Sequence, residues 1–199
     1  MQQRAEDSWT RNAQQIAEDV TSAAATIDAR LVVVAGDEHA ARELVGALPG
    51  DLRVHVVAGG RAPGGDDDQL AEEVVHVVGD AAARDTRAVL AAFGEASGRH
   101  DHAVEGVDAT VAALAAGRVA VLLVDDDPDD ERRVWVGDGP LEIGALPGDV
   151  EGMGGGEPRS ARMVDACIRA AIGSGAVVRV VPGAAAASPA EGVGAILRW

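Results

Sequence analysis

The densest group of chemically active side chains in the sequence is the acidic run Asp125–Glu131, in which only Pro128 lacks a carboxylate. The run directly follows Val119–Val124, an apolar segment with the pattern of a buried strand. Phosphotransfer enzymes place a nucleophilic aspartate after such a strand, and carboxylates also bind divalent cations. The spacing fits neither chemistry, because Asp129 stands where a haloacid-dehalogenase motif needs Thr or Val, and Asp130 stands where an EF-hand needs Gly. We interpret the run as a solvated acidic loop and keep a metal-dependent phosphoesterase as an alternative.

Two glycine-rich segments have some features of phosphate-binding loops. Gly59 and Gly64 have the spacing of a P-loop, but the required Lys is missing and Asp66 stands in the place of Ser or Thr. Gly152–Gly156 is followed by Glu157, whose charge is wrong for an anion site. We therefore expect both segments to be structural turns.

His100 and His102 form the only histidine pair in the sequence, and together with Asp101 they offer side chains that can bind a metal ion. A zinc site needs three or four ligands, and the single Cys167 lies in the apolar helical stretch Val164–Ile172. The sequence therefore predicts no catalytic centre, no metal site and no cofactor.

The composition is that of a globular protein with a strongly acidic surface. Hydrophobic residues make up 47% and charged residues 25% of the 199 positions, and the net charge is −16. All 17 basic residues are Arg, so chemistry that requires lysine, such as Schiff-base catalysis, is excluded. The acidity disfavours binding to free DNA, and we expect protein partners.

Membrane association and secretion are also disfavoured. No segment approaches the ~20 apolar residues that span a bilayer. The N-terminal residues contain no apolar core of a signal peptide, and one Cys leaves no internal disulfide to form. These observations predict a cytoplasmic protein without a membrane partner.

Apolar runs alternate with amphipathic stretches along the chain, which predicts an α/β fold with a parallel or mixed sheet. The strand at residues 31–35 is apolar throughout, with three consecutive β-branched valines, and is expected to be buried on both faces. The remaining strands are predicted at residues 52–58, 119–124, 133–136, 176–181 and 194–199. Helices are predicted at residues 1–28, 36–48, 66–78, 82–96, 107–116 and 160–172.

A polar break at residues 97–102 divides this alternation into two α/β units, which predicts domains at residues 1–98 and 99–199. The first helix begins at Met1-Gln2-Gln3-Arg4 without the usual capping residue. A long helix without a cap suggests that the chain is the C-terminal portion of a longer protein.

Two stretches of the second half resemble a known family. Gly192–Trp199 resembles the Gly-Ile-Ala-Ala-Ile-Leu-Arg-Tyr end of the last domain in archaeal and eukaryotic class-1 release factors and Pelota. Val104–Val124 is similar to the opening of the same domain. Upstream, Arg4–Ala24 and Val34–Gly36 look like the segment after the catalytic loop of the family's middle domain. The bacterial, release-factor-like branch from actinobacteria, of the ribosome hibernation factor type, is the closer match.

The resemblance implies that residues 1–98 are the C-terminal part of an RNase H-like middle domain. It implies for residues 99–199 an α/β sandwich like that of kink-turn-binding ribosomal proteins. Family members act on the ribosome with a translational GTPase, here one like elongation factor Tu, in termination, rescue or hibernation. The Gly-Gly-Gln tripeptide of release factors is absent, since Arg61 follows Gly59-Gly60 and Glu157 follows Gly155-Gly156.

We therefore expect a non-catalytic ribosome-associated factor that acts in ribosome hibernation or rescue with a translational GTPase. An acidic protein-interaction module unrelated to translation remains an alternative, as does the phosphoesterase. Arg4 and Arg11 lie seven residues apart, which places them on nearly one helix face as a possible rRNA contact. Solvation, or pairing with neighbouring acids, is the other interpretation of these arginines. The acidic last domain is expected to face protein.

Overall fold

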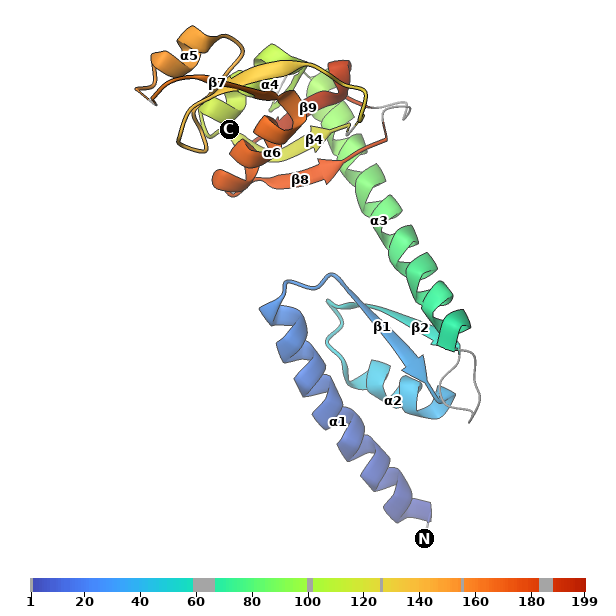
Figure 1. Cartoon of the computed structure of the whole chain (residues 1–199). Coiled ribbons are helices and arrows are strands. Elements are labelled where there is room, and N and C mark those ends of the chain that lie inside the picture. Colours follow the sequence, from blue (N-terminus) through green and yellow to red (C-terminus); the bar gives the residue numbers. More distant parts are fainter. Residues whose placement is uncertain (1, 59–66, 100–101, 126, 155, 183–187) are drawn as a thin grey trace. The chain divides into compact units, whose positions relative to one another are not determined.

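The computed structural model shows two compact units, residues 1–84 and residues 85–199, which are described separately below (Figure 1). It describes residues 2–58, 67–99, 102–125, 127–154, 156–182 and 188–199, with the side chains of residues 2–9, 58 and 67 left out. The chain mixes helices and sheets, which confirms the predicted α/β class. Within these described ranges, no helix is both long and apolar enough to cross a membrane.

The first unit is built on a parallel pair of strands joined by a helix. Its elements are α1 (Gln2–Thr26), β1 (Leu31–Gly36), α2 (Glu38–Ala47), β2 (Arg53–Ala58) and the first part of α3 (Asp67–Gly98). The two strands pair in register from Leu31 opposite Arg53 to Gly36 opposite Ala58. Asp37 fixes the start of α2, because its carboxylate accepts hydrogen bonds from the backbone N–H groups of His39 and Ala40.

The burial of β1 differs from the prediction. Val34 is its one buried residue, Leu31–Val33 and Gly36 are half-buried and Ala35 is exposed, so the strand is not covered on both faces. Covering both faces of a parallel strand takes helices on both sides of a larger sheet. In the described part of this unit, β1 pairs with β2 alone.

Helix α3 is one continuous helix, where two helices over residues 66–78 and 82–96 were predicted. Gly79 stands between the two predicted helices and lies in the middle of α3. A glycine in a helix costs only about 1 kcal/mol relative to alanine and does not by itself interrupt it.

The predicted domain boundary between residues 98 and 99 falls at the end of α3, whereas the compact units divide inside this helix, after Arg84. The reason is that Leu90 and Phe93 of α3 pack into the second unit.

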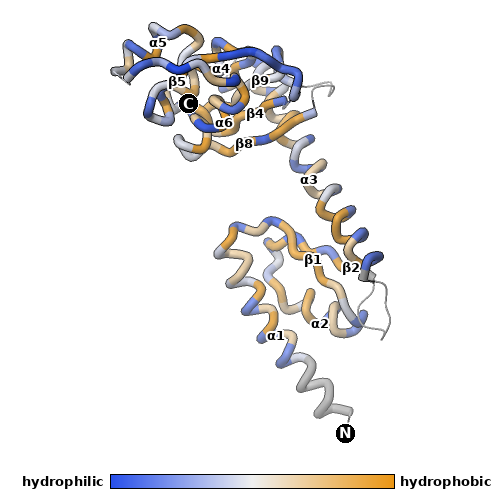
Figure 2. The backbone as a smooth tube through the Cα atoms, in the orientation of Figure 1, coloured by the Kyte–Doolittle hydropathy of each residue, from blue (hydrophilic) through white to orange (hydrophobic). Residues whose placement is uncertain are grey.

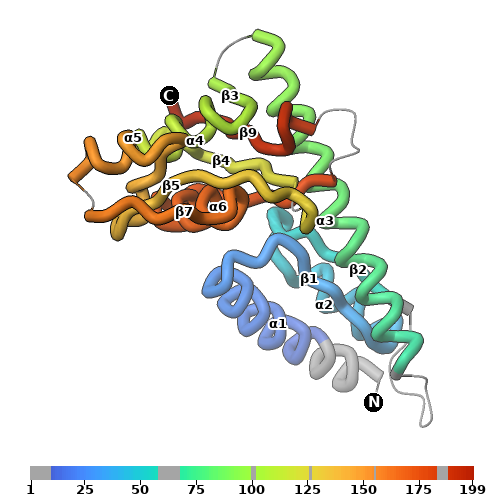
Figure 3. Tube along the Cα trace, turned by 45° about the horizontal axis from the view of Figure 1, so that its top comes forward, coloured from blue at the N-terminus to red at the C-terminus, as the bar shows by residue number. Residues whose placement is uncertain are grey.

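The second unit contains two sheets, one of four strands in the order β3-β9-β4-β8 and one of three strands in the order β6-β5-β7 (Figure 3). Strand β9 is antiparallel to β3 and β4, and β8 is parallel to β4, so the larger sheet is mixed. After α3, the elements of the second unit are β3 (Ala103–Glu105), α4 (Val107–Ala115), β4 (Val119–Val124), β5 (Arg133–Val136), β6 (Ile143–Gly144), α5 (Pro147–Glu151), β7 (Arg159–Arg162), α6 (Met163–Gly173), β8 (Val177–Val180) and β9 (Val193–Leu197), with a 3-10 turn at Ala190–Gly192.

The core of this unit lies on both sides of β4, which is apolar throughout (Figure 2). Leu122 and Val124 pack with buried residues of α4 and α6. Leu123 belongs to a second cluster that includes Leu90 and Phe93 of α3. Because successive residues of a strand point to opposite faces, α3 covers the face opposite to α4 and α6.

Two predicted elements of this unit differ in detail. The helix expected at residues 160–172 begins only at Met163, because residues 159–162 form β7 and pair with β5, Arg133 lying opposite Arg162. No helix was predicted between residues 116 and 160, but this stretch contains the short helix α5. Strands β4 and β5 have the bounds that the sequence predicts.

We predict that Gly194→Ala destabilises the second unit by about 1–3 kcal/mol, since overpacking in a filled core costs that much. A Cβ at Gly194 would lie 2.7 Å from Cβ of Pro189, 2.9 Å from Cζ of Phe93 and 3.0 Å from the carbonyl oxygen of Val104. The matched control is Gly94→Ala in α3, where a Cβ meets no atom within 4 Å. The control should stabilise by about 0.5–1 kcal/mol because alanine is the better helix former. Urea unfolding of the two variants measures both effects, and equal stabilities would contradict the packing of β9 described here.

Candidate functional site

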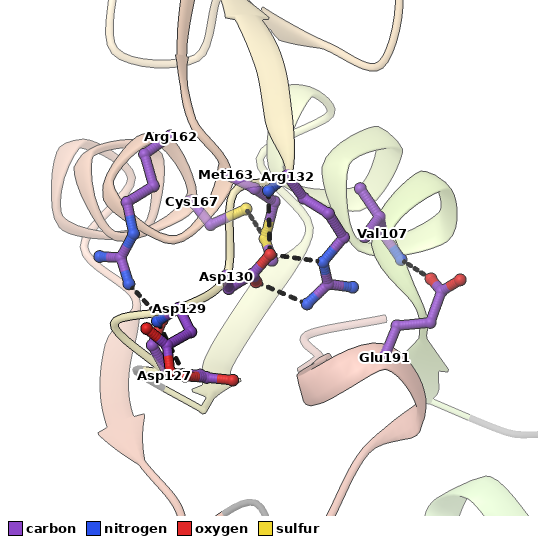
Figure 4. A network of polar contacts seen from close by, with 9 residues as sticks. All are labelled: Val107, Asp127, Asp129, Asp130, Arg132, Arg162, Met163, Cys167 and Glu191. Carbon is purple, nitrogen blue, oxygen red and sulfur yellow. Dashed lines mark hydrogen bonds and ion pairs between the residues drawn. The ribbon is translucent and has the colours of Figure 1, made fainter.

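The acidic run Asp125–Glu131 forms a loop at the carboxyl end of β4, as the sequence predicts. The backbone N–H of Asp125 donates a 2.7 Å hydrogen bond to the carbonyl oxygen of Gly192, next to β9. The carbonyl oxygen of Val124 accepts a 2.8 Å hydrogen bond from Val181. The loop therefore begins from a position held by two segments that are distant in the sequence. Figure 4 shows the polar contacts of Asp127, Asp129 and Asp130 within the loop.

Asp130 is bound by the guanidinium group of Arg132 in a two-point interaction. Nε of Arg132 donates to Oδ1 of Asp130 at 2.8 Å, and Nη2 donates to Oδ2 at 2.6 Å. The backbone N–H of Arg132 also donates to Oδ1, at 3.0 Å. The Asp130 side chain is only 9% exposed, and that of Arg132 is 41% exposed. The hydrogen bonds from Arg132 lower the pKa of Asp130, so this carboxylate stays charged and is fully engaged.

A second arginine fixes the other side of the loop. Nη2 of Arg162 donates a 2.7 Å hydrogen bond to the carbonyl oxygen of Asp127, and Nη1 lies 3.3 Å from Oδ1 of Asp165. The Asp127 carboxylate accepts a 2.9 Å hydrogen bond from the backbone N–H of Asp129, which closes a tight turn. Arg162 is the residue before α6, so the loop is tied to the start of that helix.

This arrangement presents carboxylates on a fixed turn rather than directing them toward one point. Asp127 and Asp129 are exposed, whereas Asp130 faces Arg132. The described residues hold no group of three or more His, Cys, Asp or Glu side chains that could bind a metal ion. Asp126, His100 and Asp101 lie outside the described residues, so the absence of a metal site stays a prediction.

Cys167 lies inside the unit, with its thiol 3.9 Å from the sulfur of Met163. Burial raises the pKa of this thiol to about 12. A nucleophilic cysteine needs a lowered pKa, so Cys167 has the properties of a core residue.

The start of α4 is capped from the far end of the chain. The carboxylate of Glu191 accepts a 2.8 Å hydrogen bond from the backbone N–H of Val107, the first residue of α4. Gly106, just before the helix, has φ +82°, and a Cβ there would lie 3.0 Å from the Glu191 carboxylate. The backbone N–H of Gly106 also donates a 2.9 Å hydrogen bond to the carbonyl oxygen of Val193. The two stretches that resemble the release factors therefore meet here, and they pair through β3 and β9.

Of the residues predicted to contact rRNA, Arg11 is exposed on α1, and the side chain of Arg4 lies outside the described residues. Gly154 and Gly156 have positive φ angles of 77° and 73°, which confirms that this glycine-rich segment makes turns. The other glycine-rich segment, residues 59–65, also lies outside the described residues.

Sequence reasoning missed Arg132, Arg162 and Glu191 as partners of the loop and of α4. Arg132 follows the acidic run directly, and an Asp two residues before an Arg was a usable signal for a local pair. Arg162 and Glu191 are far away in the sequence from what they bind, and no local signal identifies them.

The fold is similar to a chain of a solved structure described as ribosome-bound archaeal Pelota and ABCE1, with a TM-score of 0.62 and 18% identity over 95% of this chain and 49% of that one. Two further structures have lower scores. The C-terminal domain of a peptide chain release factor from Methanosarcina mazei has a TM-score of 0.47 and 19% identity, over 66% of this chain and 92% of that one. Pelota from Archaeoglobus fulgidus has a TM-score of 0.45 and 18% identity, over 92% of this chain and 53% of that one.

Residues 1–99 match the family model of bacterial archaeo-eukaryotic release factor family 2. The chain belongs to a release-factor-like family, which confirms the resemblance inferred from the sequence. It spans about half the length of the Pelota chain that it resembles. A search of curated proteins found no match.

We predict that Asp130→Asn lowers the free energy of unfolding by about 1–2 kcal/mol at neutral pH, because it removes a charge-assisted hydrogen-bond pair that solvent screens on one side. The folded-state pKa of Asp130 is below its usual value of 3.8. Its stabilisation is therefore fully present above about pH 4–5 and is lost as the pH falls through the lowered pKa. Urea unfolding from pH 7 to pH 3 should show the difference between the two proteins shrinking with acid. Asp129→Asn, in the same loop and exposed, is the matched control and should change stability by less than about 0.5 kcal/mol.

We also predict that Glu191→Ala costs about 1 kcal/mol, the usual value of a lost helix cap. Alanine keeps the positive φ of 55° as strained as glutamate does, so the change isolates the cap. Hydrogen exchange at the amide of Val107 should accelerate in this variant, while the equally exposed Glu131→Ala leaves it unchanged. An unaltered Val107 amide would show that Glu191 does not cap α4.

Proposed function

We propose that this chain is a non-catalytic ribosome-associated factor that acts in ribosome hibernation or rescue together with a translational GTPase like elongation factor Tu. The observation that carries the proposal is the match of residues 1–99 to a release factor family. The fold similarity to a chain in a ribosome-bound Pelota structure supports it. In this proposal, residues 1–98 correspond to part of the RNase H-like middle domain and residues 99–199 to the last domain of the family.

The chemistry of the described side chains supports a role without catalysis by this chain. In the acidic loop Asp125–Glu131, the Arg132 side chain binds both carboxylate oxygens of Asp130. The thiol of Cys167 is buried and has a pKa of about 12. Neither group is prepared for nucleophilic or acid–base catalysis at neutral pH.

The charge distribution supports a protein partner for the second unit. The chain has a net charge of −16, and Asp127 and Asp129 stand exposed on a turn that Arg162 fixes. A fixed anionic surface attracts a basic patch on a protein and is repelled by phosphates. A GTPase or a ribosomal protein with a basic surface fits this requirement.

Co-sedimentation with 70S ribosomes, with and without elongation factor Tu bound to a non-hydrolysable GTP analogue, tests the proposal. We expect the chain to pellet with ribosomes and the GTPase to increase the bound fraction. A chain that stays in the supernatant under both conditions, at low salt, would contradict ribosome association. The rate of peptide release from ribosomes that carry peptidyl-tRNA should be the same with the chain as with buffer alone. A higher rate with the chain would contradict the absence of catalysis.

The contact with rRNA is proposed to come from α1. Arg11 is exposed there, and the backbone places position 4 two turns earlier on nearly the same face. We predict that the double variant Arg4→Ala/Arg11→Ala binds ribosomes more weakly and that its salt dependence is less steep by about one unit of slope per lost phosphate contact. Arg84→Ala/Arg87→Ala, a pair of exposed positions on α3, is the matched control for charge. Equal slopes for the two double variants would remove α1 from the interface.

A further inference from the structure

An open groove of about 530 Å³ lies on the second unit between α4 and the segment that forms β6 and α5. Helix α4 contacts β6, and β6 contacts α5, so the segments that line the groove pack against one another. The sequence gives no sign of the groove, because its two walls come from segments about thirty residues apart.

The floor of the groove is apolar and its walls are made of small residues. Val111 and Ile143 form the floor and are almost completely buried. Ala112 and Ala115 of α4 form one wall, and Ala145 belongs to the other. Small side chains leave room that a bulky apolar side chain from outside could fill, which would remove apolar surface from water.

Large apolar side chains also stand at the edge of the groove. Met153 lines it and is 44% exposed, and Leu146, next to Ala145, is 65% exposed. Exposed large apolar side chains beside an apolar groove are typical of protein-binding surfaces. Methionine is flexible and polarisable and adapts to the shape of a bound side chain.

The charged residues of the groove all have the same sign. Asp108 and Asp149 line it, and no basic side chain is among its described lining residues. Asp149 accepts a hydrogen bond from the backbone N–H of Leu146, which holds it at the edge of the groove without neutralising its charge. An occupant that combines an apolar side chain with neighbouring positive charges therefore complements the groove.

We infer that this groove binds an amphipathic segment of a protein partner that presents bulky apolar side chains between arginine or lysine residues. The groove is defined by its own lining and charge, so the inference goes beyond the proposed function and does not depend on ribosome binding. A helix supplies such a pattern when its apolar side chains stand at i and i+4 with basic residues flanking them.

The test uses the full chain and a synthetic helical peptide of about 15 residues, with leucines at i and i+4 and arginines on both sides. NMR titration should shift the amide signals of Val111, Ala112 and Ala145. A peptide with both leucines replaced by serine should bind about tenfold or more weakly, since each buried leucine contributes that much. A peptide with its arginines replaced by glutamate should not bind.

Two protein variants with the same charge change localise the binding. Ala112→Arg fills the groove and adds a positive charge that repels the arginines of the peptide, so it should weaken peptide binding about tenfold or more. Ala109→Arg places the same charge on an exposed position of the same helix outside the groove and should stay within about twofold of the unchanged protein. Met153→Ser provides a second variant at the edge of the groove, and it should also weaken binding.

Three results would overturn the inference. The first is the absence of shifts at the groove. The second is equal weakening by Ala112→Arg and Ala109→Arg, which would show attraction by net charge alone. The third is self-association of the chain that Ala112→Arg abolishes, because a second copy would then be the occupant. Amide shifts at the groove that depend on the leucines and arginines of the peptide and on Ala112 would establish that the groove binds such a segment.

Discussion

The second unit depends on the insertion of β9 between β3 and β4. Residues 193–197 pair with β3 on one side and with β4 on the other, although they are separated from both in the sequence by about seventy residues or more. Gly194 permits this because its missing side chain leaves space for Phe93 and Pro189. The residues around β9 then order the unit: Gly192 anchors the acidic loop, Glu191 caps α4, and the guanidinium group of Arg198 donates to the carbonyl oxygens of Gly117 and Ser174, at the ends of α4 and α6.

In this acidic, lysine-free chain, arginine side chains make the ion pairs and hydrogen bonds that hold the acidic loop in place. A guanidinium group is a rigid planar fork that matches the two oxygens of a carboxylate, whereas an ammonium group acts as a compact point charge. Arg132 uses this geometry on the carboxylate of Asp130, and Arg162 uses it to join the loop to the start of α6. The result is a fixed anionic turn at the surface. In the function proposed here, this surface recognises a basic patch on a protein partner.

The features that local sequence determines could be predicted, and those that depend on distant partners could not. Strand β4 is a continuous apolar run and β5 alternates, so both were found at their observed bounds. Strands β3, β6 and β7 are short and polar or glycine-containing, and they exist because β9 and β5 pair with them. The acidic loop was predicted as a loop, but Arg162 lies about thirty residues away and its role needs the fold. The groove beside α4 was not predictable for the same reason, since its walls are brought together only by the packing of β6.

Hydrogen exchange of the unchanged chain tests the central role of β9 most directly. The amide of Leu197 donates to the carbonyl oxygen of His102, and β9 lies in the interior of its sheet. If β9 holds the second unit together, the amides of Ala195 and Leu197 should exchange as slowly as those of β4, through global unfolding of this unit. Exchange at Ala195 and Leu197 that is fast while the amides of β4 stay protected would contradict the account, because the sheet would then persist without its C-terminal strand.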